Sequence, residues 1–170
     1  MSSTDRCLAV EYSHGVSVGL VDDETRRSHG FAFDRAAEVY ARSRPGYPPE
    51  SAAWLAGTTP RQVLDLGAGT GALTAELVGL GHRVVAADPS PAMLVELGVQ
   101  APRARRVQAV GEHLPFETES FAVVTVAGAF HWMDQELALP ELARVLRPAR
   151  RPRFRLQHTG GDHTLGQGAG

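Results

Sequence analysis

Three glycines alternate with small residues in the segment 67–71, Gly-Ala-Gly-Thr-Gly. A short apolar run that carries Asp65 comes before them, and a stretch with helical periodicity, 72–78, follows them. Glycine has no Cβ and tolerates positive φ, so such a turn lets a ligand reach bare backbone N–H groups at the start of a helix. This spacing favours the binding of a nucleoside cofactor.

A second acidic residue, Asp88, ends another apolar run, 84–87, twenty-one positions after Gly67. An acid at the tip of the second strand of such a unit can accept hydrogen bonds from both hydroxyls of a ribose. The Pro-Ser-Pro that follows also suits a simple turn or helix cap. We interpret Asp88 as a ribose ligand, because its place at the strand tip fits that role better than a cap alone.

The glycine spacing also satisfies the dinucleotide fingerprint, with Ala72 in its last position. Asp65 argues against a dinucleotide, because its carboxylate would repel a pyrophosphate at this turn. An NAD(P)-dependent oxidoreductase is therefore the less favoured alternative.

All 17 basic residues are arginines. A P-loop and a Schiff-base mechanism both need a lysine, so both are excluded.

Alternating strands and helices are expected to position these residues. The sequence predicts strands at 62–66, 83–87, 105–110 and 121–127, and helices at 31–41, 49–56, 71–80, from 91 onward and at 134–146. This alternation is typical of an α/β fold with a Rossmann-like, doubly wound parallel sheet in a three-layer α/β/α arrangement.

The glycine turn, Asp88 and the later Leu-Pro-Phe at 114–116 together resemble the class I S-adenosylmethionine-dependent methyltransferases. Within that class, the chain is similar to the small-molecule group with a type 11 methyltransferase domain. The resemblance covers about 31–148 and includes the segments 33–48, 127–132 and 142–148. It implies S-adenosyl-L-methionine as the cofactor and a small-molecule methyl acceptor. The sulfonium methyl is already electrophilic, so such an enzyme chiefly positions donor and acceptor.

The resemblance also implies roles for single residues. Asp65 would lie beside the ammonium of the cofactor. Val110 or Gly111 replaces the aspartate that usually contacts adenine, so backbone groups would make that contact. Glu112 is equally well explained as a solvated side chain. The residues expected at the cofactor are Asp65, Gly67, Ala68, Gly69, Gly71, Asp88, Pro89, Gly111, Glu112 and Ala127.

Substrate contacts are expected from two segments. Tyr40, Arg44 and Tyr47 could cover the sulfonium, or they could simply pack the segment that leads into the domain. The other expected contacts follow the fourth strand and are Phe130, His131 and Trp132. The catalytic residue is unknown. His131 is a candidate base, although a lone histidine is more often structural.

Composition limits the partners. The net charge of −2 leaves no basic field for nucleic acid, and no apolar run is long enough to span a membrane. The single cysteine, Cys7, favours a reduced, cytoplasmic setting. No metal site is proposed, because His158 and His163 lack partners at ligand spacing. The oligomeric state is left open.

The methyltransferase domain is expected at 30–148, between a poorly ordered extension at 1–29 and a disordered tail at 149–170, which is basic and then rich in Gly and His. The resembled family continues with Gly-Gly and further strands, whereas Ala-Arg-Arg-Pro follows Pro148 here. We therefore expect the C-terminal strands of the family to be missing, as in a frameshifted gene, and the strand at 123–126 to have an exposed edge. A truncated, non-catalytic cofactor-binding fragment is the alternative function.

Overall fold

The computed structural model describes residues 7–13, 46–148 and 153–159. The strands are β1 (Cys7–Ser13), β2 (Gln62–Leu66), β3 (Arg83–Asp88), β4 (Arg105–Gln108), β5 (Val123–Ala127) and β6 (Arg153–Thr159). The helices are α2 (Pro49–Ala56), α3 (Ala72–Gly79), α4 (Pro91–Gln100) and α5 (Gln135–Val145), with a 3-10 turn η1 (Phe130–Trp132) before α5.

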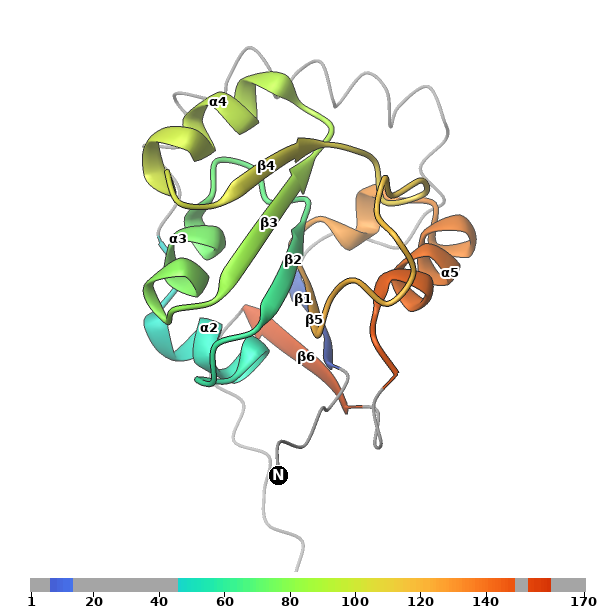
Figure 1. The fold of residues 1–170 in the computed structure, drawn as a ribbon, viewed down its shortest axis with the longest axis horizontal. Coiled ribbons are helices and arrows are strands. Elements are labelled where there is room, and N and C mark those ends of the chain that lie inside the picture. The colour runs from blue at the N-terminus through green and yellow to red at the C-terminus, as the bar shows by residue number, and fades with distance from the viewer. Residues whose placement is uncertain (1–6, 14–45, 149–152, 160–170) are drawn as a thin grey trace, which may run out of the picture.

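The strands form one sheet in the order β4-β3-β2-β5-β1-β6, and neighbouring strands pair in parallel (Figure 1). Parallel strands place all their carboxyl ends at one edge of the sheet. The turn after β2, the end of β3 and the loop after β5 therefore meet there, at the point where ligands bind in open α/β sheets. The predicted Rossmann-like, doubly wound parallel sheet is confirmed.

Helices cover both faces of the sheet, with α2, α3 and α4 on one side and α5 on the other (Figure 1). Successive strand residues point to opposite faces: Val63 packs into the core under the first three helices, and Leu64 packs into the core under α5. Leu77 and Leu97 anchor α3 and α4 in the first core. Burying each such side chain stabilises the fold by about 1.5–3 kcal/mol. Because both faces are covered, β5 is almost wholly apolar, and every residue of β2 after Gln62 is buried.

The helix boundaries follow the local capping signals. The hydroxyl of Ser90 accepts a hydrogen bond from the backbone N–H of Met93 (3.1 Å) and caps α4, as the sequence predicted. The carboxylate of Asp134 caps α5 by accepting from the N–H groups of Glu136 and Leu137. Two predicted strands are shorter than expected: β4 ends at Gln108, and β5 begins at Val123.

The structure differs from the sequence-based expectation near both ends of the chain. Strands β1 and β6 lie in the segments 1–29 and 149–170, which were expected to lack regular structure. The edge of β5 that was expected to be exposed is paired: residues 7–11 of β1 align with 123–127, and β6 lies outside β1. A parallel strand offers unpaired N–H and C=O groups along its edge, and a segment from any part of the chain can satisfy them. The predicted helix at 31–41 lies outside the described residues.

None of the described helices is both long and apolar enough to cross a membrane.

Candidate functional site

The turn between β2 and α3 uses backbone conformations that favour glycine. Gly67, Gly69 and Gly71 have φ values of +67°, +55° and +91°. A Cβ on Gly67 would overlap the side chain of Ala129, and one on Gly71 would lie 2.7 Å from Cγ of Leu97. A Cβ on Gly69 would meet no atom of the described residues within 4 Å. Gly67 and Gly71 are therefore required by packing, whereas packing against the described residues does not require Gly69.

Asp88 ties this turn to the start of α4. Its Oδ2 accepts a hydrogen bond from the N–H of Gly69 (2.8 Å), and its Oδ1 accepts one from the N–H of Ser90 (2.9 Å). The residue is 7% exposed. A carboxylate has about four acceptor positions, so Asp88 can also accept from ligand hydroxyls. The neighbouring Pro89 is exposed, and its carbonyl accepts from Nε2 of Gln108 (3.0 Å).

Asp65 lies beneath the turn and is only 1% exposed. Its Oδ2 accepts from the hydroxyl of Thr74 in α3 (2.6 Å), and its Oδ1 accepts from the hydroxyl of Thr125 in β5 (2.8 Å). Burial raises the pKa of Asp65 to about 6, although the two hydroxyls act in the opposite direction. Asp65 therefore joins β2, α3 and β5 below the turn, a role that the sequence prediction did not include.

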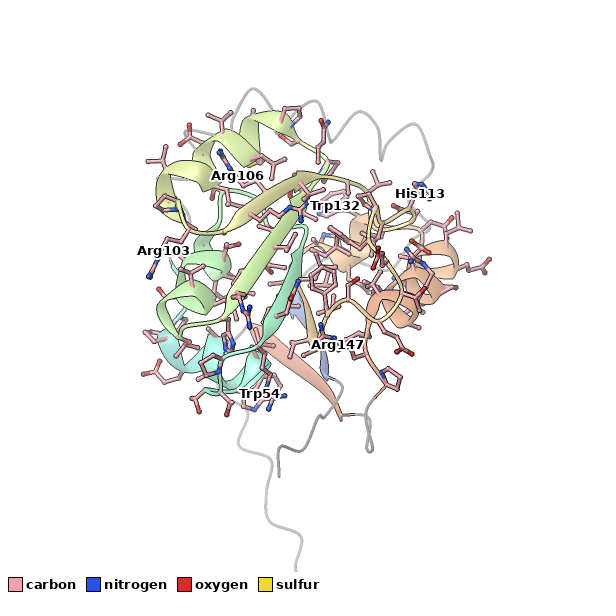
Figure 2. The ribbon with its side chains drawn as sticks, in the orientation of Figure 1. Trp54, Arg103, Arg106, His113, Trp132 and Arg147 are labelled. Carbon is pink, nitrogen blue, oxygen red and sulfur yellow. The ribbon has the colours of Figure 1, made fainter. Side chains whose placement is uncertain are left out.

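The loop after β5 forms the next wall of the site. Ala127 and the three residues of η1 are half-buried. The rings of His131 and Trp132 lie 4.7 Å apart between centroids, and Trp132 is near the carboxyl ends of the central strands (Figure 2). Burial lowers the pKa of His131, so its ring is neutral near pH 7 and can accept a proton.

Met133 packs between the loops that follow β2 and β4. A Cβ on Gly111 would lie 2.6 Å from the sulfur of Met133, and one on Gly67 would lie 3.7 Å from its Cε. Glu112 is half-buried, and its Oε1 accepts from the N–H of Asp134 (2.7 Å). In this structure Glu112 therefore connects the loop after β4 to the start of α5. Sequence reasoning identified neither contact.

The Leu-Pro-Phe turn is held by a pair of charged side chains on α5. Glu141 accepts from the N–H of Leu114 (2.9 Å), and Arg144 donates to the carbonyls of Phe116 (2.7 Å) and Leu114 (3.0 Å). Arg144 also pairs with Glu141 at 2.7 Å. The hydrogen bonds from Arg144 and from the Leu114 N–H lower the pKa of Glu141 to about 2. The pair is thus charged at neutral pH and fixes this turn against α5.

The structure brings together most of the residues predicted at the cofactor. Ala68, Ala127 and the predicted substrate residue Tyr47 all pack against the core under α2, α3 and α4. Tyr40 and Arg44 lie outside the described residues. Within the described ranges, no group of three or more His, Cys, Asp or Glu side chains is arranged to hold a metal.

Comparison with known proteins agrees with this geometry. Residues 64–150 match a family model described as a methyltransferase domain. An uncharacterized methyltransferase of Mycobacterium tuberculosis is 46% identical over 127 residues, which cover 75% of this chain and 52% of that protein. A demethylmenaquinone methyltransferase of Clavibacter sepedonicus is 41% identical over 95 residues, covering 53% of this chain and 38% of that protein. The chain spans about half the length of the first of these relatives and less of the second.

Solved structures show the same fold. A candidate type II methyltransferase from Anaeromyxobacter dehalogenans has 32% identity and a TM-score of 0.59, over 69% of this chain and 49% of that one. A TehB-like SAM-dependent methyltransferase from Corynebacterium glutamicum has 23% identity and a TM-score of 0.56, over 76% of this chain and 72% of that one. The chain therefore belongs to the methyltransferase-domain family and has the fold of the class I S-adenosylmethionine-dependent methyltransferases.

Proposed function

We propose that this chain binds S-adenosylmethionine at the turn 67–71 and transfers its methyl group to a small-molecule acceptor. The observation that carries the proposal is the geometry of Gly69. Its φ is positive, a Cβ there would meet no atom of the described residues within 4 Å, and its N–H donates to the carboxylate of Asp88. A nucleoside ligand needs such an approach to the backbone beside an acceptor for its ribose.

The described residues fit the parts of this cofactor. The turn would hold the methionine end at the start of α3, where backbone N–H groups point outward. Asp88 and Pro89 would lie at the ribose, and Gly111 and Glu112 would line the adenine side. Asp65 would lie beneath the turn, beside the ammonium of the methionine end. When bound, the cofactor supplies an electrophilic methyl group.

The acceptor would lie against the loop after β5. Phe130, His131 and Trp132 would contact it, and Tyr47 with Tyr40 and Arg44 would close the site from the preceding segment. A neutral His131 could take a proton from a phenol or an amine, whereas a carboxylate acceptor needs no base. The relative named demethylmenaquinone methyltransferase supports a small-molecule acceptor. The family match favours methyl transfer over both the oxidoreductase and the non-catalytic fragment. A cytoplasmic location stays a prediction.

Replacing Asp88 with alanine should weaken binding of S-adenosylhomocysteine about tenfold or more. Each hydrogen bond to a charged acceptor contributes about 1.5–3 kcal/mol, and the variant loses those from the ribose. Calorimetric titration measures the change. Asp134→Ala is the matched control, because Asp134 also accepts from two backbone N–H groups at a helix start but is not among the predicted ligands. Equal affinities of the wild type and Asp88→Ala would refute the ribose assignment.

Methyl transfer itself can be tested by measuring S-adenosylhomocysteine formation with a panel of phenols, carboxylates and quinols. We expect product with at least one acceptor, and none without an acceptor. Protection against thermal unfolding by NADH but not by S-adenosylhomocysteine would instead support the oxidoreductase.

A further inference from the structure

The side chain of Met133 lies between two loops that come from different strands. In the loop after β4, a Cβ on Gly111 would lie 2.6 Å from Sδ and 3.3 Å from Cγ of Met133. In the turn after β2, a Cβ on Gly67 would lie 3.7 Å from Cε of the same side chain. Strand β3 separates β2 from β4 in the sheet. One unbranched side chain therefore spans the gap between the two loops.

Gly111 leaves room for Met133. Its φ is not among the positive values, so its backbone does not itself favour glycine. The space that its missing Cβ leaves is occupied by the thioether of Met133, and Cδ2 of Leu66 would lie 3.4 Å from such a Cβ. A small residue on one loop is thus matched to a large one on the other.

The segment that carries Met133 is held on both sides of it. The Cβ of Ala129 occupies the space where a Cβ of Gly67 would lie, and the N–H of Asp134 donates to Oε1 of Glu112 (2.7 Å). Filling the core does not fully explain Met133, because it packs at the margin of the core under α5 and is only half-buried. Its distinctive feature is that it contacts both loops.

We propose that Met133 is a positioning residue that sets the distance between the turn 67–71 and the loop 110–112. This inference rests on the proposed function, in which the turn holds the methionine end of the cofactor and the loop lines the adenine side. A ligand that reaches both loops needs them at a fixed separation, and a misplacement of about 1 Å can cost about a hundredfold in rate. A thioether suits this place, because its unbranched chain fills irregular gaps.

Calorimetric titration of Met133→Ala with two ligands tests the proposal. We expect binding of S-adenosylhomocysteine to weaken about tenfold, because it must reach both loops. Binding of 5′-methylthioadenosine should change much less, since this ligand lacks the amino-acid part and does not need the turn at a fixed distance. Met133→Leu restores most of the lost volume and should bind S-adenosylhomocysteine nearly as the wild type does.

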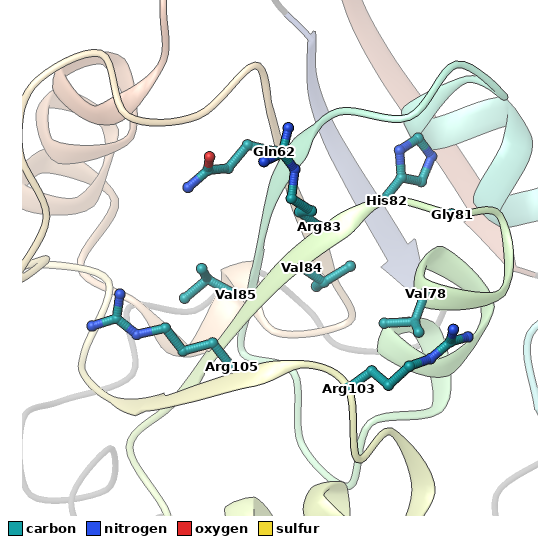
Figure 3. A pocket seen from close by; sticks show the side chains of 9 residues that line it. All are labelled: Gln62, Val78, Gly81, His82, Arg83, Val84, Val85, Arg103 and Arg105. Atoms are coloured by element: carbon teal, nitrogen blue, oxygen red, sulfur yellow. The ribbon is translucent and has the colours of Figure 1, made fainter.

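Val78→Ala is the matched control. Val78 is also a half-buried apolar residue, but it lines a separate pocket of about 380 Å³ at the amino ends of β2, β3 and β4 (Figure 3). The glycine turn follows the carboxyl end of β2, at the opposite edge of the sheet. The affinities of Val78→Ala for both ligands should therefore equal those of the wild type.

Gly111→Ala tests the same gap from its other side. The new Cβ would overlap the thioether of Met133, so this variant should also lose affinity for S-adenosylhomocysteine. When Gly111→Ala is combined with Met133→Ala, the new methyl group enters the space that the thioether has left. The losses of the two single variants should therefore not add. Urea titration of each variant shows whether it is folded.

Unchanged binding of S-adenosylhomocysteine by Met133→Ala would overturn the positioning role. Equal losses for both ligands would show a purely structural role and overturn it as well, and so would strictly additive losses in the double variant. Where the wild type binds 5′-methylthioadenosine too weakly to measure, the double variant decides. No binding of S-adenosylhomocysteine by the wild type would instead refute the proposed function itself.

Discussion

Replacing Gly69 with valine should abolish binding of S-adenosylhomocysteine and leave the chain folded. The new Cβ would meet no described atom within 4 Å. Packing around this Cβ is therefore undisturbed, whereas a ligand that approaches the backbone is blocked. We expect at least a hundredfold loss of affinity, equivalent to about 2.8 kcal/mol. Calorimetry measures the loss, and a urea titration reports on the fold.

Gly57→Val provides a matched control. Gly57 also has a positive φ, +78°, and a Cβ there would likewise meet no described atom within 4 Å. Both variants carry a similar backbone cost of about 1–2 kcal/mol, because a side chain is forced into the left-handed region. Only Gly69→Val should lose the ligand. If Gly57→Val loses it equally, or if Gly69→Val keeps it, the turn at Gly69 is not the cofactor site.

The central part of the fold could be predicted because its signals are local. Apolar runs of strand length alternate with helical periodicity, and Ser90 and Pro91 mark the start of α4 by their own chemistry. The turn 67–71 and Asp88 could be placed together for the same reason. Parallel strands bring the residues that follow them to one edge of the sheet, whatever the details of side-chain packing.

The strands near the two ends could not be predicted in this way. Pairing of β1 with β5 joins residues more than a hundred positions apart, as Cys7 aligned with Val123 shows. A short strand has little intrinsic preference, and its stability comes from the neighbouring strand rather than from its own sequence. The open edge of β5 is therefore what indicates that a further strand such as β1 must pair there. The sequence predicts that this edge is exposed and does not identify its partner.

The side-chain contacts within the site could not be predicted from the sequence either. Thr125 lies sixty positions from Asp65, and its hydroxyl could be matched to that carboxylate only after β2 and β5 were aligned. The Glu141 and Arg144 pair has a visible i, i+3 spacing. Nothing in that spacing shows that the pair holds the backbone of Leu114. Whether a polar side chain points toward the glycine turn or bonds to another part of the chain depends on the three-dimensional packing and not on the sequence spacing.

The buried carboxylate of Asp65 should make stability fall as the pH rises from about 4 to 7. Its folded pKa of about 6 lies above the ordinary value of 3.8. Between these values the folded chain keeps the proton that the unfolded chain has lost. The stabilisation is thus complete below the unfolded pKa and is lost as the pH rises through the folded pKa. From pH 4 to pH 7 the loss is about 2 kcal/mol.

Asp65→Asn isolates this effect, because an amide of nearly the same shape does not titrate. One threonine hydroxyl can still donate to the amide oxygen, and the other can accept from the amide nitrogen. We expect the stability of the wild type relative to Asp65→Asn, measured by urea unfolding, to fall over this pH range. Thr125→Val removes one hydrogen bond that lowers the pKa of Asp65, so the fall should extend to higher pH. Parallel pH profiles for the wild type and Asp65→Asn would mean that Asp65 titrates normally and is not enclosed between Thr74 and Thr125.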